Sequence, residues 1–375
     1  MKRKNFFRGL ALGTLSLPFL IRGTMGDTAA QQNSAQTTDQ RKFTWRMVTT
    51  WPPNFPILDD GCKLFADWVR AMSNGRLDIQ VFGGGELVPP LEAFDTVRNG
   101  AAEMGSGASY YWAGKAPAAQ FFASVPFGMN AQQHTAWILH GGGMELWREV
   151  YGKLGVVPFL AGNTGLQMGG WFRRRIDTTA DLQGLKMRIP GLGGKVLAKA
   201  GGTPVLLAGG ELYTGLERGV IDATEWIGPY HDSLMGFPEI APYYYTPGWH
   251  ELGTAFELFA NQERYNELPE DLRLILDTAA LRLNTWVWMA FETKNAEYLE
   301  KIRATGNTEI LRFPPEVLDS LRRYTRQVID ELTTGDPMAA KVYQSYSDFQ
   351  QKIKPWAEIT EAVYYRDIMG ASPLG

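Results

Sequence analysis

Residues 43–82 read FTWRMVTTWPPNFPILDDGCKLFADWVRAMSNGRLDIQVF, and this stretch alone predicts the class of fold. Residues 43–50 alternate and are rich in β-forming side chains, which favours an opening strand that ends at the turn Trp51-Pro52-Pro53. Within 57–72 the apolar positions recur every three or four residues and form one helix face: Leu58, Cys62, Phe65, Val69 and Met72. Residues 77–82 are a second strand, so strand, helix and strand follow one another as in an α/β sheet.

The same alternation continues down the chain. Helices are expected at 90–99, 131–153 and 195–200, and strands at 156–160, 165–172, 186–189 and 204–207. From Pro269 onward, residues 269–304 form a helical pattern without an internal proline or glycine. At about 1.5 Å per residue this helix would reach roughly 54 Å, which exceeds the width of one domain. We therefore expect it to run across two lobes.

The 375 residues are enough for two domains. We expect two α/β lobes joined by crossing segments and the long helix, with a ligand cleft between the lobes. Lobe I is assigned to residues 43–160 with a return segment around 250–268, and lobe II to 161–250. Amphipathic helices fill 315–368.

The N-terminus has the layout of a secretory signal. Lys2, Arg3, Lys4 and Arg8 precede an apolar segment at 9–21, which is too short for a membrane span of about 20 residues. We assign residues 1–30 to a cleaved signal peptide and 31–42 to a flexible leader, and this places the mature chain in the periplasm. The lysine in the Arg3-Lys4 pair leaves both twin-arginine and general export open.

Charge and composition exclude several classes of function. The formal net charge of −3 becomes −7 once the five Lys/Arg and one Asp of residues 1–30 are removed. An acidic chain is a poor nucleic-acid binder, so no nucleic-acid partner is expected. No later stretch is long and apolar enough for membrane insertion, so the mature chain should not enter the bilayer.

Familiar catalytic motifs are missing. The four histidines, His134, His140, His231 and His250, lack zinc-type spacing, and no Gly-x-Ser-x-Gly elbow occurs. The glycine runs at 83–85 and 141–143 match neither a phosphate loop nor a dinucleotide fingerprint. These observations favour a binding protein over an enzyme.

Arg188 is the first candidate ligand contact. It lies in a short, otherwise apolar strand that ends at Pro190. Because a buried guanidinium without an anionic partner is costly, Arg188 should face either a cleft or a fixed acid. Its planar fork suits a carboxylate, but a structural ion pair explains the same pattern equally well.

Two acids are the next candidates. Glu225 is expected at the carboxyl end of a strand, the edge of an open α/β sheet where ligands bind. Glu251 follows the aromatic, proline-bracketed stretch 243–249. A single glutamate on a loop is more often simply solvated.

These segments resemble a known family. Residues 181–190 (DLQGLKMRIP) and 216–226 (LERGVIDATEW) are similar to the solute-binding proteins of tripartite ATP-independent periplasmic (TRAP) transporters, which belong to the DctP family. YYWAGK at 110–115, GGW at 169–171, WIGPY at 226–230 and PGWHE at 247–251 resemble the branch that binds 2-oxo acids or lactate. The resemblance covers about residues 43–365 and implies a fold like that of type II periplasmic binding proteins.

The resemblance also implies a site. The arginine at position 188 would grip the substrate carboxylate while a metal ion bridges the ligand to the protein. The implied ion donors are the side chains of Gln167, Glu225 and Glu251 and the backbone carbonyl of Trp226. Oxygen donors suit a hard cation, so Na⁺ or Ca²⁺ is expected. Tyr110, Tyr111 and Asn163 are further candidate ligand contacts, as are Gln167 and Glu225 themselves.

The expected function is capture of a small 2-oxo or 2-hydroxy monocarboxylate, such as pyruvate, 2-oxobutyrate or lactate, for TRAP membrane permease subunits. A periplasmic metal-dependent lyase or decarboxylase acting on 2-oxo acids and a ligand-sensing module are the alternatives. The branch also resembles a homodimer built through C-terminal helices. Tyr343, Tyr346 and Phe349 of the amphipathic 337–365 region are expected to be exposed and would fit that contact, although packing within one chain fits equally well.

Overall fold

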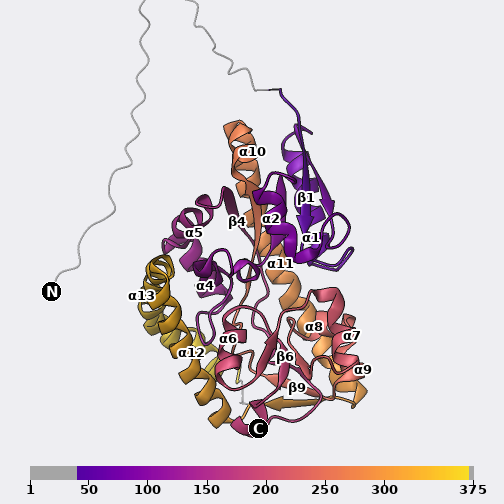
Figure 1. The fold of residues 1–375 in the computed structure, drawn as a ribbon, viewed down its shortest axis with the longest axis vertical. Coiled ribbons are helices and arrows are strands. Elements are labelled where there is room, and N and C mark those ends of the chain that lie inside the picture. The colour runs from indigo at the N-terminus through magenta and orange to yellow at the C-terminus, as the bar shows by residue number, and fades with distance from the viewer. Residues whose placement is uncertain (1–39, 371–375) are drawn as a thin grey trace, which may run out of the picture. The chain divides into compact units, whose positions relative to one another are not determined.

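A computed structural model describes residues 40–370 of the chain. The signal peptide predicted for 1–30 and most of the leader predicted for 31–42 lie outside the described residues. Within 40–370, none of the helices combines the length and apolarity that are needed to cross a membrane. The strands form two mixed sheets, one in each of two α/β lobes (Figure 1).

The sheet of lobe I has five strands in the order β2-β1-β3-β10-β4. They are β1 (Phe43–Thr49), β2 (Leu77–Phe82), β3 (Met104–Gly107), β4 (Val156–Asn163) and β10 (Ala255–Asn261). β1 pairs in parallel with β2 and β3, whereas β10 is antiparallel to β3 and β4. The return segment expected around 250–268 therefore fills the gap between two strands that lie earlier in the chain. The helices of this lobe are α1 (Leu58–Met72), α2 (Ala93–Arg98), α3 (Gln120–Ala123), α4 (Ala131–His140), α5 (Gly143–Gly152) and α10 (Gln262–Glu267), with the 3-10 turns η1 (Pro90–Glu92), η2 (Ser109–Trp112) and η3 (Pro117–Ala119).

The sheet of lobe II has six short strands in the order β11-β9-β5-β8-β6-β7. They are β5 (Gly170–Phe172), β6 (Lys186–Arg188), β7 (Thr203–Val205), β8 (Ala223–Thr224), β9 (Tyr243–Thr246) and β11 (Glu309–Arg312). β11 lies outside the range 161–250 that the sequence suggests for this lobe. The helices here are α6 (Gly191–Lys199), α7 (Leu212–Glu217), α8 (Pro229–Leu234) and α9 (Phe237–Ile240), with η4 (Thr179–Leu182) and η5 (Gly209–Glu211).

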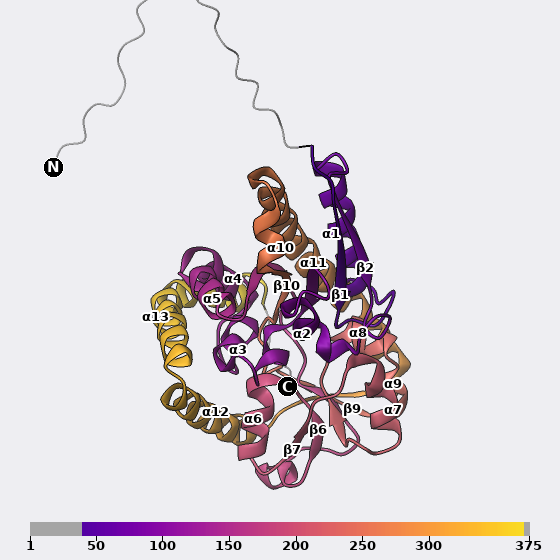
Figure 2. The same cartoon turned by 45° about the horizontal axis from the view of Figure 1, so that its top comes forward.

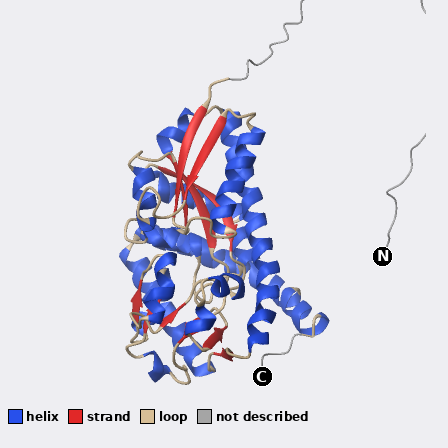
Figure 3. Cartoon of the chain, turned by 90° about the vertical axis from the view of Figure 1, so that its right-hand side faces the viewer, coloured by secondary structure: helices blue, strands red, loops and turns tan. Residues whose placement is uncertain are grey.

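The long helix α11 spans Glu270–Thr305, one residue away from its predicted ends. Acidic Glu270 and Asp271 lie in its first turn, where their negative charges interact favourably with the positive end of the helix dipole. The helix ends at Gly306, which has a positive φ. α11 packs against β4 and α1 of lobe I and against α8 of lobe II, so it connects both lobes (Figures 1 and 3).

Two predicted elements are shorter than expected. The helix predicted for 131–153 is two helices, because Gly141 and Gly142 interrupt it and Gly142 has a φ of 89°. The strand predicted for 165–172 is confined to Gly170–Phe172. The residues between Asn163 and Gly170 cross from one sheet to the other and make only isolated backbone hydrogen bonds, such as that from Gly169 to Tyr245, in place of a strand ladder.

The C-terminal helices pack on their own chain. α12 (Pro315–Gly335) lies against α6 of lobe II, and α13 (Pro337–Ile359) lies against α4 and α5 of lobe I (Figure 2). Tyr346, expected to be exposed, is buried, and its hydroxyl accepts a hydrogen bond from the Met129 amide at 2.7 Å. The ring of Tyr343 lies 5.3 Å from that of Phe121 in the same chain, in a tilted arrangement. The expectation of an exposed aromatic face is therefore wrong for Tyr346. Past this contact, α14 (Glu361–Val363) and the π-turn η6 (Tyr364–Ile368) end the described chain.

Candidate functional site

A small cavity lies where the two sheets face each other. Its volume is about 10 Å³, and it is lined by Trp51, Tyr110, Tyr111, Gln167, Arg188, Trp226, Ile227 and Phe256. Lobe I contributes the end of β1, the turn η2 and β10, lobe II contributes the ends of β6 and β8, and Gln167 comes from a crossing segment. This is about the room that one water molecule needs, so the two lobes are packed closely around the cavity. A wider groove between α1, α8 and α11 is lined by Ile57, Tyr230 and Met289 among others, but a buried charged residue, Arg188, lines the smaller cavity.

Arg188 is buried at the end of β6 and is bonded mainly to Glu225. Its Nη1 donates to a carboxylate oxygen of Glu225 and, at 3.2 Å, to the Glu225 backbone carbonyl. Nε donates to the Leu207 carbonyl at 3.3 Å, and Nη2 reaches only the Tyr111 hydroxyl, at 3.4 Å. Burial opposes the charge, but Glu225 and nearby tyrosines raise the pKa of Arg188 above its ordinary value. The guanidinium thus stays charged and has one weakly bonded nitrogen facing the cavity.

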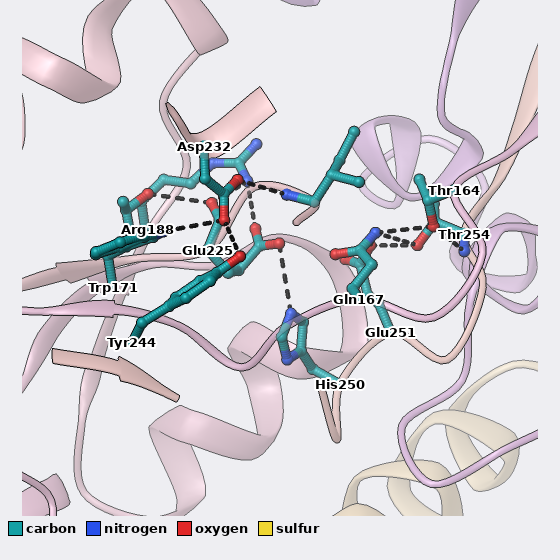
Figure 4. A network of polar contacts seen from close by, with 12 residues as sticks. Thr164, Gln167, Trp171, Arg188, Glu225, Asp232, Tyr244, His250, Glu251 and Thr254 are labelled. Carbon is teal, nitrogen blue, oxygen red and sulfur yellow. Dashed lines mark hydrogen bonds and ion pairs between the residues drawn. The ribbon is translucent and has the colours of Figure 1, made fainter. Parts of the chain in front are cut away.

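Glu225, His250 and Glu251 form a buried cluster beside Arg188 (Figure 4). Their potential donor atoms lie within 4.8 Å of one another, and all three side chains are buried. Burial, followed by the charge of Glu225, raises the pKa of Glu251 to about 7. Two carboxylates held this close in a dry site repel each other, and a cation between them would relieve that repulsion.

Gln167 completes the polar side of the cavity. Its Nε2 donates to Glu251 at 2.9 Å and to the hydroxyls of Thr164 and Thr254 at 3.2 Å each. These bonds fix the amide so that its Oε1 is left buried without a partner, as is Oε2 of Glu225. An unpartnered amide oxygen beside two carboxylates is a donor set that suits a hard cation, so the predicted residues fit such an ion.

His250 is an addition that sequence reasoning missed. Its Nε2 lies 3.4 Å from Oε2 of Glu225, and neither ring nitrogen has a hydrogen-bond partner. The oxygen-only donor set therefore has an imidazole next to it. His250 precedes Glu251 in the sequence, but without zinc-type spacing nothing in the sequence distinguished it from a core histidine.

The two tyrosines line the cavity through the turn η2. Burial raises the pKa of both Tyr110 and Tyr111, which keeps their hydroxyls protonated. The turn is fixed from behind, because the indole of Trp112 donates to buried Glu257 at 2.6 Å. Tyr151 also bonds that carboxyl, at 2.8 and 2.9 Å.

Asn163 is placed differently from the other candidates. Its Oδ1 accepts from the Gly165 amide at 2.9 Å, and its Nδ2 donates to the Gly253 carbonyl at 3.3 Å. It does not line the cavity, and unlike Glu225 and Gln167 it has no unpartnered side-chain oxygen. Its side chain holds two crossing segments together, which gives it a structural role near the site.

Aromatic rings line much of the cavity, and two of them in lobe I, Trp51 and Phe256, were not predicted. Trp51 and Phe256 meet edge to face with ring centroids 4.9 Å apart, and the Trp51 indole donates to Ser106 at 2.9 Å. Trp226 covers Arg188, whose guanidinium carbon is 5.1 Å from the ring centroid. Single aromatic residues along a sequence usually belong to the core, so no signal separated Trp51 or Phe256 from the other buried rings.

Two α/β lobes closed over a small cavity, with a cation and buried acids on one wall and aromatic rings on the other, define a solute-binding protein of the two-lobed periplasmic type. The chain belongs to the DctP family, because the model of bacterial extracellular solute-binding protein, family 7, matches residues 47–336.

Individual relatives support this assignment. A monocarboxylate 2-oxoacid-binding periplasmic protein of Nostoc sp. is 37% identical over 97% of this chain and 98% of its own length. A TRAP periplasmic solute-binding protein from Colwellia psychrerythraea, solved with calcium and pyruvate, is 42% identical, with a TM-score of 0.85 over 87% of this chain and 100% of that one. The protein from Pseudoalteromonas atlantica, solved with sodium and pyruvate, is also 42% identical, with a TM-score of 0.85 over 87% and 99%.

A third structure, from Bordetella bronchiseptica, is a mixed-occupancy dimer with copurified calcium and picolinate in one active site. It is 36% identical, with a TM-score of 0.86 over 88% of this chain and 98% of that chain. The predicted family and fold class are confirmed, and the protein is a TRAP-type extracytoplasmic solute-binding protein. Because this family consists of transport proteins, the prediction that the chain is not an enzyme is confirmed as well.

Proposed function

We propose that this protein captures a small 2-oxo or 2-hydroxy monocarboxylate in the periplasm and delivers it to the membrane subunits of a TRAP transporter. The observation that carries the proposal is that Arg188 and Gln167 line one small cavity while the buried acids Glu225 and Glu251 bond to them directly. The pyruvate and metal ions named for the similar solved proteins agree with this chemistry.

The ion would be held by Gln167, Glu225, Glu251 and the backbone carbonyl of Trp226, and Na⁺ or Ca²⁺ would fit these oxygen donors. A bound cation supplies positive charge that a carboxylate oxygen and a neighbouring oxo or hydroxyl oxygen can share. His250 would then act on Glu225, because it lies beside the carboxylate oxygen that Arg188 does not bond. In that position it would fix the orientation of a donor rather than contribute one.

Arg188 would hold the carboxylate of the solute. In the present structure its Nη1 donates to Glu225, and its Nη2 bonds only the Tyr111 hydroxyl. A cation that attracts Glu225 would weaken the ion pair and free the guanidinium for two parallel bonds to the solute. The structural ion pair and the ligand contact would thus be two states of the same side chain.

The cavity wall favours a monocarboxylate. Arg188 is the single cationic side chain among the residues that line the cavity, and the opposite wall is aromatic. A second carboxylate would be buried against Trp51 and Phe256 without a partner, which is costly. A short alkyl group, in contrast, gains from contact with these rings.

Isothermal titration of the purified protein with pyruvate tests the proposal. Before the titration the protein is stripped of ions and returned to buffers with Ca²⁺, Na⁺ or neither. We expect tight binding with an ion present, weak binding without it, and recovery of pyruvate unchanged. A C4 dicarboxylate serves as the matched control and should not compete. Equal binding of both acids, or binding independent of any ion, would refute the proposed site chemistry.

A further inference from the structure

Helix α8, Pro229–Leu234, begins one residue after the segment 225–228, which carries two of the proposed ion donors. Two consecutive residues of this helix, His231 and Asp232, are buried and bond in different directions. Neither lines the cavity or belongs to the proposed ion donors, so the proposed function does not use them.

Asp232 holds the donor segment. Its Oδ1 accepts from the Ile227 amide at 3.3 Å, next to Trp226. Its Oδ2 accepts from the Trp171 indole at 3.0 Å and the Tyr244 hydroxyl at 2.7 Å, and these two rings stack with centroids 4.1 Å apart (Figure 4). One carboxylate therefore fixes the donor segment to β5 and β9 of lobe II.

His231 holds the other lobe. Its Nε2 lies 2.9 Å from the carbonyl oxygen of Pro56, in the turn between β1 and α1 of lobe I. Since a carbonyl can only accept, Nε2 carries the proton and donates. The ring of Phe55, also in that turn, lies 4.5 Å from the imidazole and meets Trp226 edge-on at 6.3 Å.

The rest of α8 is anchored to α11. The Tyr230 amide donates to Asn295 at 3.1 Å, and Phe291 packs edge-on against His231 at 4.8 Å. Because α11 packs along both lobes, α8 lies between them, and the bond from His231 to Pro56 is a direct link from this lobe II helix to lobe I.

We infer that His231 and Asp232 are positioning residues that couple occupation of the ion site to closure of the lobes. Asp232 sets the position of the segment with Glu225 and Trp226, and His231 transmits that position to lobe I through Pro56. The inference rests on the proposed function for the identity of the ligand. The geometry of α8 supplies the coupling itself.

His231→Phe keeps the ring among its aromatic neighbours and removes the hydrogen bond, whereas His231→Gln can still donate to Pro56. We expect pyruvate in the presence of Ca²⁺ to bind roughly three- to tenfold more weakly to His231→Phe, the loss of about one hydrogen bond. Ligand-induced contraction, measured by small-angle X-ray scattering, should need correspondingly more pyruvate. His231→Gln should restore both.

His134→Phe is the matched control. His134 is also buried, and its Nε2 lies 3.1 Å from a carbonyl oxygen, but that oxygen belongs to Phe121 of the same lobe. The His134→Phe variant should have a lower melting temperature but the same pyruvate affinity and the same ligand-induced contraction as the wild type. Unchanged affinity in His231→Phe, or an equal loss in His134→Phe, would overturn the coupling role.

Asp232→Asn tests whether Asp232 positions the donor segment 225–228. An amide offers one acceptor atom, so either the Ile227 amide or the Trp171 indole must face an N–H group. We expect about tenfold more Ca²⁺ to be needed for half-saturation. In the free protein, deuterium exchange should rise in the 225–228 segment. A lower melting temperature with unchanged ion affinity and unchanged exchange would mean that Asp232 is merely structural.

The exchange measurement separates the two proposals. It is made without ion or acid, so it reports on Asp232 whatever the site binds. If the wild-type protein bound no carboxylate at all, the proposed function would fail, and faster exchange in Asp232→Asn would still support the positioning role.

Discussion

The guanidinium of Arg188 and the carboxylate of Glu225 form an ion pair with almost no exposure, 2% and 1% of the two side chains. Glu225 also lies 3.4 Å from His250, and together with Glu251 these residues form the buried cluster. The same carboxylate therefore balances the arginine in the free protein and is available to a cation. This double use links the charge state of the ion site to the state of the solute site.

Replacing Arg188 by alanine should affect binding and stability together. We expect pyruvate affinity to fall about 30-fold or more, because losing one partner of a buried charged hydrogen bond costs about 2–5 kcal/mol. The free protein should also lose about 3–5 kcal/mol of unfolding free energy, since Glu225 is left unpaired. Thermal melts with and without Ca²⁺ check the reason, because the ion should restore part of the loss. Unchanged affinity would remove Arg188 from the solute site.

Glu251→Gln should move stability and ion binding in opposite directions. The neutral amide removes the repulsion from Glu225, so the ion-free variant should melt at a higher temperature than the wild type. It should also gain little from added Ca²⁺, because one charged donor is gone. Differential scanning calorimetry across a Ca²⁺ series measures both effects. A variant that keeps the full calcium-dependent rise would show that Glu251 is not a donor.

Phe256→Ala should relax the choice of solute. Removing the ring opens space beside Trp51, so 2-oxo acids with longer alkyl chains should gain affinity relative to pyruvate. The cost to stability should be about 3–5 kcal/mol for a large aromatic residue. The ratio of the two dissociation constants is the informative quantity, because the folded fraction cancels from it. A ratio equal to that of the wild type would exclude Phe256 from the solute pocket.

Glu257 should make stability fall with rising pH. Burial raises the pKa of Glu257 from its usual 4.5 to about 8, while hydrogen bonds from Trp112 and Tyr151 oppose the shift. Between those values the folded protein keeps a proton that the unfolded chain has released. Unfolding free energy from this group should therefore drop by up to about 1.4 kcal/mol per pH unit and level off above pH 8. Denaturant melts from pH 5 to 9 should show less of this slope in Glu257→Gln, and an identical slope would contradict the assignment.

The C-terminal end of α13 is the surface to test for dimerisation. Trp356 and Ile359 are 61% and 68% exposed, and beyond them Tyr365 and Ile368 are exposed as well. We expect a homodimer, and Trp356→Asp combined with Ile359→Asp should convert it to a monomer because burying two unpaired charges is costly. Sedimentation velocity measures the change. Leu274→Asp is the control, because Leu274 is an exposed residue of α11 and lies away from the C-terminal surface. A monomeric wild type would refute the expectation.

Local patterns predicted the elements best where periodicity is strong. The buried face of α1 and the ends of α11 follow directly from the spacing of apolar residues and from the absence of internal proline and glycine. Met72 is an exception, since it fits the apolar face by spacing but is 39% exposed in the last turn of α1. The strand predicted for 165–172 failed because a crossing segment and a strand can have the same composition, and only pairing separates them.

For the site, the sequence alone determined the residue types and, through the resemblance, which of them to consider together: Arg188, Gln167, Glu225 and Glu251. Tertiary structure decided which side chains converge, because β6, β8 and the crossing segments bring residues dozens of positions apart into one dry cavity. Only the tertiary structure placed His250, Trp51 and Phe256 at the site. It also showed that the Asn163 side chain bonds the Gly165 backbone. The physical reason is that burial and pairing depend on distances in space, and these set the charge balance of Glu225 whatever its place in the chain.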